Sequence, residues 1–146
     1  MATERHGQCL CGAVQVTVAN PAPHLNACHC SMCRRWTGVA FVTLDVPEAD
    51  MTITGGDAVR AYTSSDWAER CFCGTCGTTL WYRLTAPGAP TDYYMAAGLL
   101  DDLSGITLAN EIYIDCKPEA FAFAGPTKQI TEAEFLAMLP APAQEE

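Results

Sequence analysis

The sequence predicts a single, mainly-β domain assembled from many short strands. Short apolar or β-branched segments recur along the chain, and turn-forming Gly, Pro and Asp residues separate them. The 146 residues are the length of one domain, and no linker divides them. We therefore expect one domain over residues 1–146, ordered from about residue 7 to residue 139, that forms a sandwich, a barrel or a folded sheet.

The first part of the chain predicts two strands with a short helix between them. Residues 1–6 are expected to form a loose tail. Residues 14–18 alternate valine with polar side chains, which indicates a strand with one buried face. Ser31 is expected to cap a short helix that Gly38 ends, and the apolar run 39–46 follows as a buried strand.

The remainder predicts further strands and a C-terminal helix. A Gly-Gly-Asp turn between residues 51–54 and 58–63 indicates a hairpin. More strands are expected further along, at 68–72, 78–83, 92–97 and 111–115. Thr131 and Glu134 form a capping-box sequence, so a helix is expected there, with Pro140 ending it and a disordered segment following to Glu146.

Charge and hydropathy exclude two classes of partner. The formal net charge is −9, from 8 basic and 17 acidic residues, and no basic face suited to nucleic acid is evident. No apolar run approaches the ~20 residues that span a membrane, and the N-terminal residues lack the apolar core of a secretory signal. We expect a cytoplasmic protein that binds neither nucleic acid nor membrane.

The nine cysteines indicate metal binding rather than disulfides. Their number is odd, and a reducing compartment disfavours structural disulfides. Two pairs far apart in the chain, Cys9/Cys11 and Cys73/Cys76, suit a closed four-thiolate zinc site. A thiol redox role is the alternative, but seven clustered thiols favour zinc.

Three further cysteines fall within six residues, as Cys28, Cys30 and Cys33. In an extended segment the first two sulfurs lie on one side and His29 on the other. One zinc can take all three sulfurs, and the fourth tetrahedral position is then open, as in catalytic or ligand-binding sites. The basic pair Arg34-Arg35 follows at once and suits a small anionic ligand, although a solvated pair on a short helix is the alternative.

Two cysteines remain outside these clusters. Cys71 and Cys116 are expected to behave as small buried hydrophobes. Cys71 lies two residues before Cys73, and its alternative role is the fourth ligand of the second zinc, which would close that site.

Taken together, these motifs closely resemble the glutathione-dependent formaldehyde-activating enzyme family, also called the GFA or centromere protein V domain. The resemblance runs from Gly7 to about Glu134. The motifs that carry it are Gly7-x-Cys9-x-Cys11-Gly12, Cys28-His29-Cys30-Ser31-x-Cys33-Arg34-Arg35-x-x-Gly38, Phe72-Cys73-x-x-Cys76-Gly77 and Gly98-x-Leu100-Asp101-Asp102.

The resemblance implies a zinc-binding β-tent fold of several short antiparallel sheets, with a short helix after the three-cysteine stretch and a helix at the C-terminus. It implies two zinc ions per chain, a structural one on Cys9, Cys11, Cys73 and Cys76 and a catalytic one on Cys28, Cys30 and Cys33. The sequence departs from the family at Glu111 and Phe121, in a region where members often carry histidine and tryptophan. The substrate can therefore differ.

The implied activity is that of a carbon–sulfur lyase working in the condensing direction. Glutathione would bind the open zinc position as thiolate and attack formaldehyde to give S-(hydroxymethyl)glutathione, with Arg34 or Arg35 pairing with a glutathione carboxylate. Full ionisation of a thiol of pKa ~8.5 gains at most ~30-fold in rate at neutral pH, so the rate enhancement available to an enzyme is small. Two alternatives remain, a non-catalytic carrier of glutathione or another small thiol and a zinc-stapled interaction module.

Overall fold

The computed structural model describes residues 3–139, which form eleven strands, two α-helices and four 3-10 turns. The expectation of a mainly-β chain with several sheets and two helices is confirmed. The chain divides into two compact units. The first combines the segment up to Pro23 with Thr43–Ile106, and the second combines His24–Val42 with the segment from Thr107 onward.

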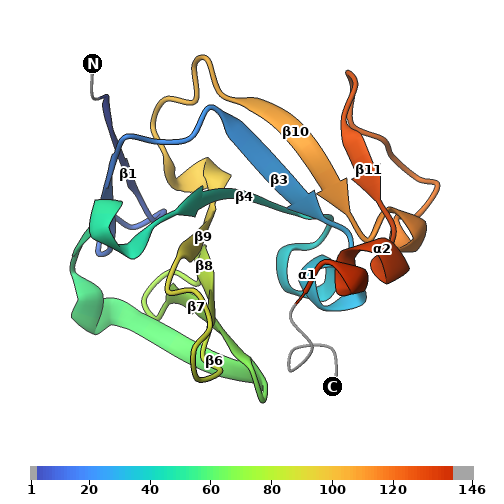
Figure 1. The fold of residues 1–146 in the computed structure, drawn as a ribbon. Helices are drawn as coiled ribbons and strands as arrows, with labels where there is room; N and C mark the ends of the chain where they lie inside the picture. The colour runs from blue at the N-terminus through green and yellow to red at the C-terminus, as the bar shows by residue number, and fades with distance from the viewer. Residues whose placement is uncertain (1–2, 140–146) are drawn as a thin grey trace. The chain divides into compact units, whose positions relative to one another are not determined.

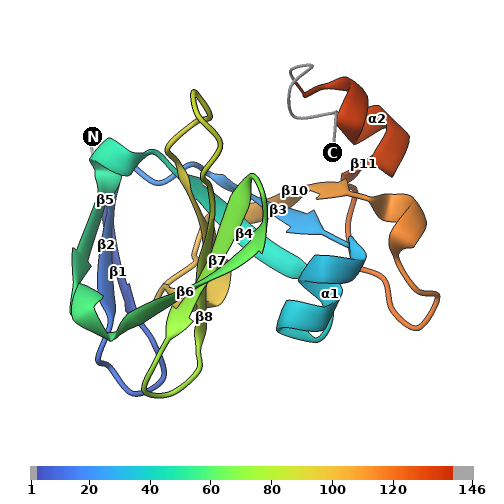
Figure 2. The same cartoon turned by 90° about the horizontal axis from the view of Figure 1, so that it is seen from below.

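A three-stranded antiparallel sheet begins the first unit, in the order β1-β2-β5. Its strands are β1 (Glu4–Gln8), β2 (Gln15–Ala19) and β5 (Met51–Thr54). Val16 and Val18 are buried on one face of β2, as their alternation predicts. Figure 2 shows the three strands side by side.

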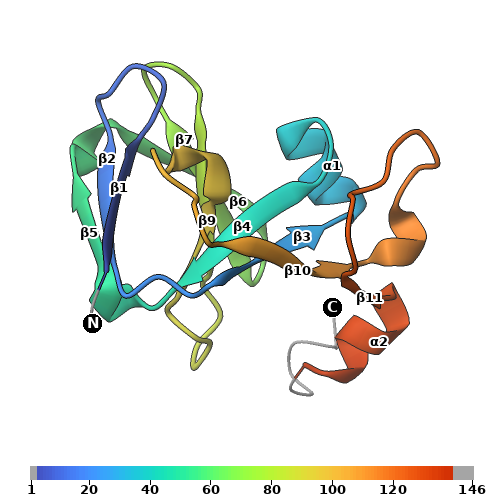
Figure 3. The same cartoon turned by 90° about the horizontal axis from the view of Figure 1, so that it is seen from above.

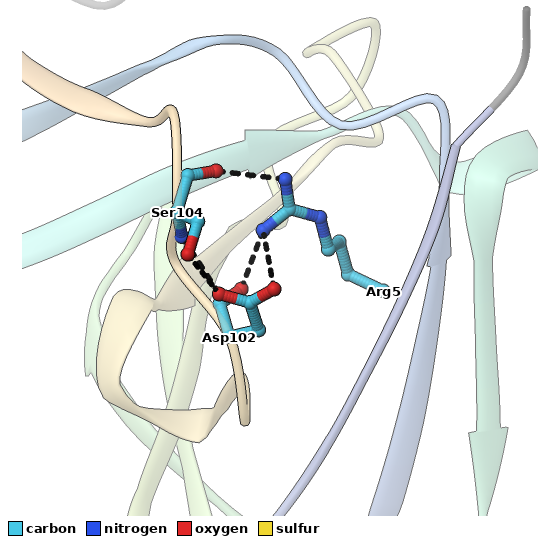
Figure 4. A network of polar contacts seen from close by, with 3 residues as sticks. All are labelled: Arg5, Asp102 and Ser104. Carbon is cyan, nitrogen blue, oxygen red and sulfur yellow. Dashed lines mark hydrogen bonds and ion pairs between the residues drawn. The ribbon is translucent and has the colours of Figure 1, made fainter.

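The expected loose tail over residues 1–6 is wrong for the part that the structure describes. Glu4 pairs with Ala19, so β1 starts well before residue 7. Figure 4 shows Arg5, which donates to the carbonyl oxygens of Asp102 (2.7 Å) and Ser104 (2.8 Å). Strand pairing and these long-range hydrogen bonds order a polar segment that carries no hydrophobic pattern.

The other strands of the first unit follow the order β4-β9-β8-β7-β6, and neighbours are antiparallel. The core side chains Leu44, Leu80 and Met95 are fully buried. The strands are β4 (Phe41–Val46), β6 (Val59–Ser65), β7 (Ala68–Cys73), β8 (Thr79–Leu84) and β9 (Tyr93–Ala96).

The predicted hairpin between residues 51–54 and 58–63 is wrong. β5 pairs with β2, whereas β6 pairs with β7. Gly55 adopts a φ of 80°, and the 3-10 turn Gly56–Ala58 follows it, so the chain leaves one sheet before it enters the next. The turn residues were correctly located, but they connect two sheets.

The second unit contains β3 (His24–Cys28), β10 (Thr107–Ile112) and β11 (Lys128–Ile130), in the order β11-β10-β3 (Figure 1). Both pairings are parallel. The antiparallel expectation therefore holds in the first unit and not here. The strand predicted at 111–115 ends at Ile112, because Tyr113 turns the chain with a φ of 56° and a 3-10 turn follows.

Two short helices complete the second unit. α1 (Ser31–Thr37) ends at Gly38, as predicted, with a φ of 96°. Its N-cap is Cys30 rather than Ser31, because the Cys30 sulfur accepts from the N–H of Cys33. α2 (Glu132–Ala137) carries the predicted capping box. The predicted stop at Pro140 and the terminal segment lie outside the described residues.

Over residues 3–139, none of the helices combines the length and the apolar character needed to cross a membrane.

Candidate metal centres

Four cysteines from two distant loops gather in the first unit. Cys9 and Cys11 lie in the β1–β2 loop, Cys73 ends β7, and Cys76 lies in the β7–β8 loop. Their ligand atoms all lie within 4.8 Å of one another, with Sγ–Sγ distances of 3.7 Å for Cys9–Cys11 and 3.9 Å for Cys11–Cys73. Figures 2 and 3 show the two loops side by side. The four sulfurs could therefore hold one metal ion.

Similar turns present the sulfurs in each loop. The N–H of Gly12 donates to the carbonyl of Cys9 (3.1 Å), and the N–H of Gly77 donates to that of Cys73 (2.8 Å). Both glycines have a φ near +80°, which other residues rarely adopt (81° and 80°). Backbone N–H groups point at the sulfurs, from Val14 to Cys9 (3.3 Å) and from Thr75 to Cys73 (3.4 Å). These donors stabilise thiolates and leave the remaining lone pairs for a cation.

The electrostatics of the four sulfurs favour a cation at their centre. The Thr78 hydroxyl, 3.1 Å from the Cys76 sulfur, lowers the pKa of that thiol to about 5. A hydrogen bond from the Ala13 backbone lowers the pKa of the Cys11 thiol. Desolvation and the neighbouring sulfurs outweigh this effect and raise that pKa to about 11. Four thiols this close cannot all ionise unless a positive charge offsets their repulsion.

Three cysteines from one short stretch gather in the second unit. Cys28 ends β3, Cys30 caps α1, and Cys33 lies in the first turn of α1. Their ligand atoms lie within 4.8 Å of one another, and among the described residues this group comprises these three donors. Hydrogen bonding with the sulfurs of Cys30 and Cys33 strongly raises the pKa of the Cys28 thiol. The predicted triad is therefore brought together, and it too could hold a metal ion.

The two arginines that follow occupy different faces of α1. Arg34 lies four residues after Cys30 and so projects from the same face as the cap residue. Arg34 is half-buried, whereas Arg35, one residue further around the helix, is exposed. The basic pair is therefore asymmetric with respect to the three cysteines.

The surroundings of Cys71 suit the small hydrophobe that the sequence predicts. Its side chain is buried in β7, with the sulfur 3.7 Å from a Glu69 carboxylate oxygen. Burial raises the pKa of this thiol to about 12. The half-buried Cys116 lies instead with Asp115 and Glu132 in a third, partly exposed group that the sequence analysis did not find.

Comparison with known proteins places these motifs in a family. A family model described as glutathione-dependent formaldehyde-activating enzyme matches residues 4–116, a range that contains both cysteine groups. The chain belongs to this family. It is also 34% identical over 133 residues to an uncharacterized lyase of Schizosaccharomyces pombe, covering 91% of this chain and 95% of that protein.

Two further comparisons give matches of lower identity. A Halomonas elongata protein named for the same enzyme is 32% identical over 83 residues, covering 51% of this chain and 53% of that protein. A crystal structure of a Rhodobacter sphaeroides protein matches with a TM-score of 0.55 at 25% identity, covering 71% of this chain and 99% of that chain. The shared fold thus extends over most of the chain.

Within this family member, a buried polar pair lies directly beside the three cysteines. His29, between Cys28 and Cys30, is 1% exposed, and its Nε2 lies 2.7 Å from Oε1 of Glu111, which is 2% exposed. Burial opposes ionisation of Glu111, but hydrogen bonds from Thr127 and His29 outweigh it and hold the carboxyl pKa below its usual value. Alternation in an extended segment predicts that His29 points away from the sulfurs, but it identifies no partner for the side chain.

Aromatic rings enclose the His29 side chain. The rings of Phe121 and Phe123 each lie with centroids 5.9 Å from the imidazole. Glu111 and Phe121, the two positions where the resemblance implied a departure from the family pattern, therefore both contact His29. Only the folded chain brings these residues to the histidine, because more than 80 residues separate Glu111 from it (|i−j| = 82).

Proposed function

We propose that this chain is a zinc-dependent carbon–sulfur lyase that forms S-(hydroxymethyl)glutathione from glutathione and formaldehyde. The observation that carries the proposal is the inequality of the two cysteine groups, four sulfurs in one and three in the other. A four-sulfur group suits a closed structural zinc, and a three-sulfur group leaves a coordination position for a substrate. The family description and the lyase named among its relatives support the same reaction class.

In this proposal two zinc ions bind per chain. Cys9, Cys11, Cys73 and Cys76 would hold the structural ion. Cys28, Cys30 and Cys33 would hold the other, which would supply a Lewis acid that keeps the glutathione sulfur ionised at neutral pH. The donor sets fit zinc because thiolates are soft ligands and both groups bring their sulfurs within the spacing that one ion requires.

The reaction balances without any further reactant. The glutathione sulfur attacks the formaldehyde carbon, and a carbon–sulfur bond forms as the carbonyl π bond breaks. The carbonyl oxygen takes up the proton that the thiol has lost, which gives the hydroxymethyl group. The protein residues hold the thiol and exclude competing geometries, so their contribution is mainly orientation.

Arg34 and Arg35 are the proposed substrate-binding residues. A guanidinium can form a bidentate pair with a carboxylate, and glutathione carries two carboxylates. Arg34 shares the helix face of Cys30 and is half-buried, so its pairing is less screened by solvent than that of the exposed Arg35. We therefore assign the larger share of glutathione binding to Arg34.

A carrier of glutathione or another small thiol is the second candidate. The small rate enhancement available for the thiol addition favours a carrier, since ionisation alone gains at most ~30-fold in rate at neutral pH. Both candidates use the same open position, a small thiol and, for the enzyme, a small aldehyde. The nine cysteines form no disulfide within the described residues 3–139, which suits a reducing compartment, so we propose a cytoplasmic location.

A rate comparison separates these candidates. S-(hydroxymethyl)glutathione formation is followed by NMR at low reactant concentrations, without protein, with zinc-loaded wild type and with zinc-loaded Cys30→Ser. We expect acceleration by the wild type and none by Cys30→Ser. A saturable glutathione-induced change in the cobalt spectrum without acceleration would support the carrier, and the absence of both effects would exclude both candidates.

A further inference from the structure

The His29 side chain is held at a single polar contact. Its Nε2 is hydrogen-bonded to Oε1 of Glu111. Its Nδ1 is buried and has no hydrogen-bond partner among the residues that the structure describes. The ring orientation therefore depends on Glu111 and on the packing of Phe121 and Phe123. Loss of the Glu111 acceptor would leave the ring with no polar contact.

Glu111 is itself fixed from its other side. The Thr127 hydroxyl donates to Oε2 of Glu111. Thr127 comes just before β11, which pairs in parallel with β10 through Glu111↔Gln129. The Thr127 hydroxyl, next to the neighbouring strand β11, therefore orients the Glu111 carboxylate that contacts His29. The side chains of His29, Glu111 and Thr127 form one hydrogen-bonded network.

The network meets the backbone directly before Cys30. Cys28 lies in register with Ile112 at the end of β3, and the N–H of His29 donates to the Ile112 carbonyl (3.1 Å). Beyond that bond the chain leaves the strand, and the backbone angles of His29 set the direction to Cys30. A side chain held on β10 restrains those angles, and with them the spacing of Cys28 and Cys30.

Stability alone gives little reason for such a pair. A buried polar or ionic pair is often matched or exceeded in stability by apolar residues of similar volume. A fixed spacing of metal ligands, in contrast, requires a directional contact, and partners that orient ligands typically change metal affinity 10- to 100-fold when mutated.

We propose that His29 and Glu111 are positioning residues that preset the three-cysteine site for its metal. The proposal rests on the proposed function only in that Cys28, Cys30 and Cys33 bind an ion. It assigns to the pair a role in metal affinity, beyond its contribution to folding.

Cobalt(II) affinity tests the proposal without reference to catalysis. Affinity is measured by competition with a chromophoric chelator, and the second site is defined as the thiolate-to-cobalt absorption that Cys30→Ser removes. We expect Glu111→Leu to weaken this site about 10- to 100-fold. Glu111→Gln keeps an acceptor for Nε2 and should stay within a few-fold of the wild type, by the general geometry of the amide group.

Asn110→Ala is the matched control. It removes a side-chain hydrogen bond of 2.8 Å between Asn110 and Asn26, across the same β10–β3 pair, without touching His29. We expect it to lower the melting temperature and leave second-site affinity unchanged. Thr127→Val, a milder change that keeps the His29–Glu111 contact, should weaken the site only a few-fold and provides a test should Glu111→Leu not fold.

Each failure is distinguishable. Absence of Cys30-dependent cobalt absorption in the wild type would remove the metal site of the proposed function, and with it this proposal. Normal cobalt binding by the wild type with equal affinity in Glu111→Leu and Thr127→Val would overturn the positioning role alone. An equal loss in Asn110→Ala would also overturn it, because general loosening of the strand pair would then explain the effect.

Discussion

At the scale of single residues, Gly7 shows how a motif can be structural. Gly7 is buried in β1 and bridges Leu100 in the Gly-x-Leu-Asp-Asp segment. A Cβ at this position would lie 2.1 Å from the carbonyl oxygen of Leu99, far inside van der Waals contact. The first and the last of the four motifs therefore meet at this point, and the absence of a side chain allows the two backbones to approach.

Gly7→Ala should destabilise the first unit by about 1–3 kcal/mol or more, because the backbone of Leu99 must shift to admit the methyl group. Urea unfolding of the zinc-loaded protein measures the effect. Gly98→Ala is the control, since a Cβ there meets no atom within 4 Å. A Gly7→Ala variant as stable as Gly98→Ala would show that the approach is easily relaxed.

At the scale of elements, β1 is attached by side-chain contacts as well as by its ladder. Arg5 donates to two backbone carbonyls in the 102–104 loop (Figure 4). Asp102 supports that loop by accepting from the N–H (2.9 Å) and hydroxyl (2.6 Å) of Ser104. Hydrogen bonds from Ser104 hold the pKa of the Asp102 carboxyl below its usual value. These hydrogen bonds help to order a polar strand that the sequence predicts to be a loose tail.

Arg5→Met should cost about 1–3 kcal/mol of unfolding free energy, because two carbonyl groups lose a charged donor. Hydrogen exchange of the β1 amides should rise at the same time. Asp102→Asn leaves both carbonyl acceptors in place and keeps a side-chain oxygen that can accept from Ser104, but it removes the 3.8 Å ion pair with Arg5, so it should have a much smaller effect. Equal effects of the two variants would assign the attachment to the ion pair.

At the scale of the whole molecule, the two cysteine groups differ in what they connect. The four-cysteine group joins the β1–β2 loop to β7 and the β7–β8 loop, so a metal there ties together two sheets of the first unit. The three-cysteine group takes all its donors from residues 28–33. A cross-link between distant segments constrains the unfolded chain far more than one within six residues.

Loss of the first metal should therefore unfold the protein, whereas loss of the second should not. Cys9→Ser is expected to be unfolded or insoluble, since structural zinc contributes on the order of 10 kcal/mol in small domains. Cys30→Ser should retain the circular dichroism of the wild type and bind one zinc ion fewer.

Titration with a chelator should release metal in two steps, the accessible three-cysteine site first. A single release step with loss of fold would contradict this assignment.

Local sequence patterns are sufficient to predict the mainly-β class, the two helices and the division of seven cysteines into groups of four and three. These features depend on local signals, namely residue alternation, caps and ligand spacing, which are readable within a few residues. Four features required the folded chain: the ordering of β1 as a strand, the separation of β5 from β6, the parallel pairing of β3, β10 and β11, and the contact of His29 with Glu111. Each of these joins segments far apart in the chain, and partner choice between distant strands depends on packing and backbone pairing that no local pattern contains.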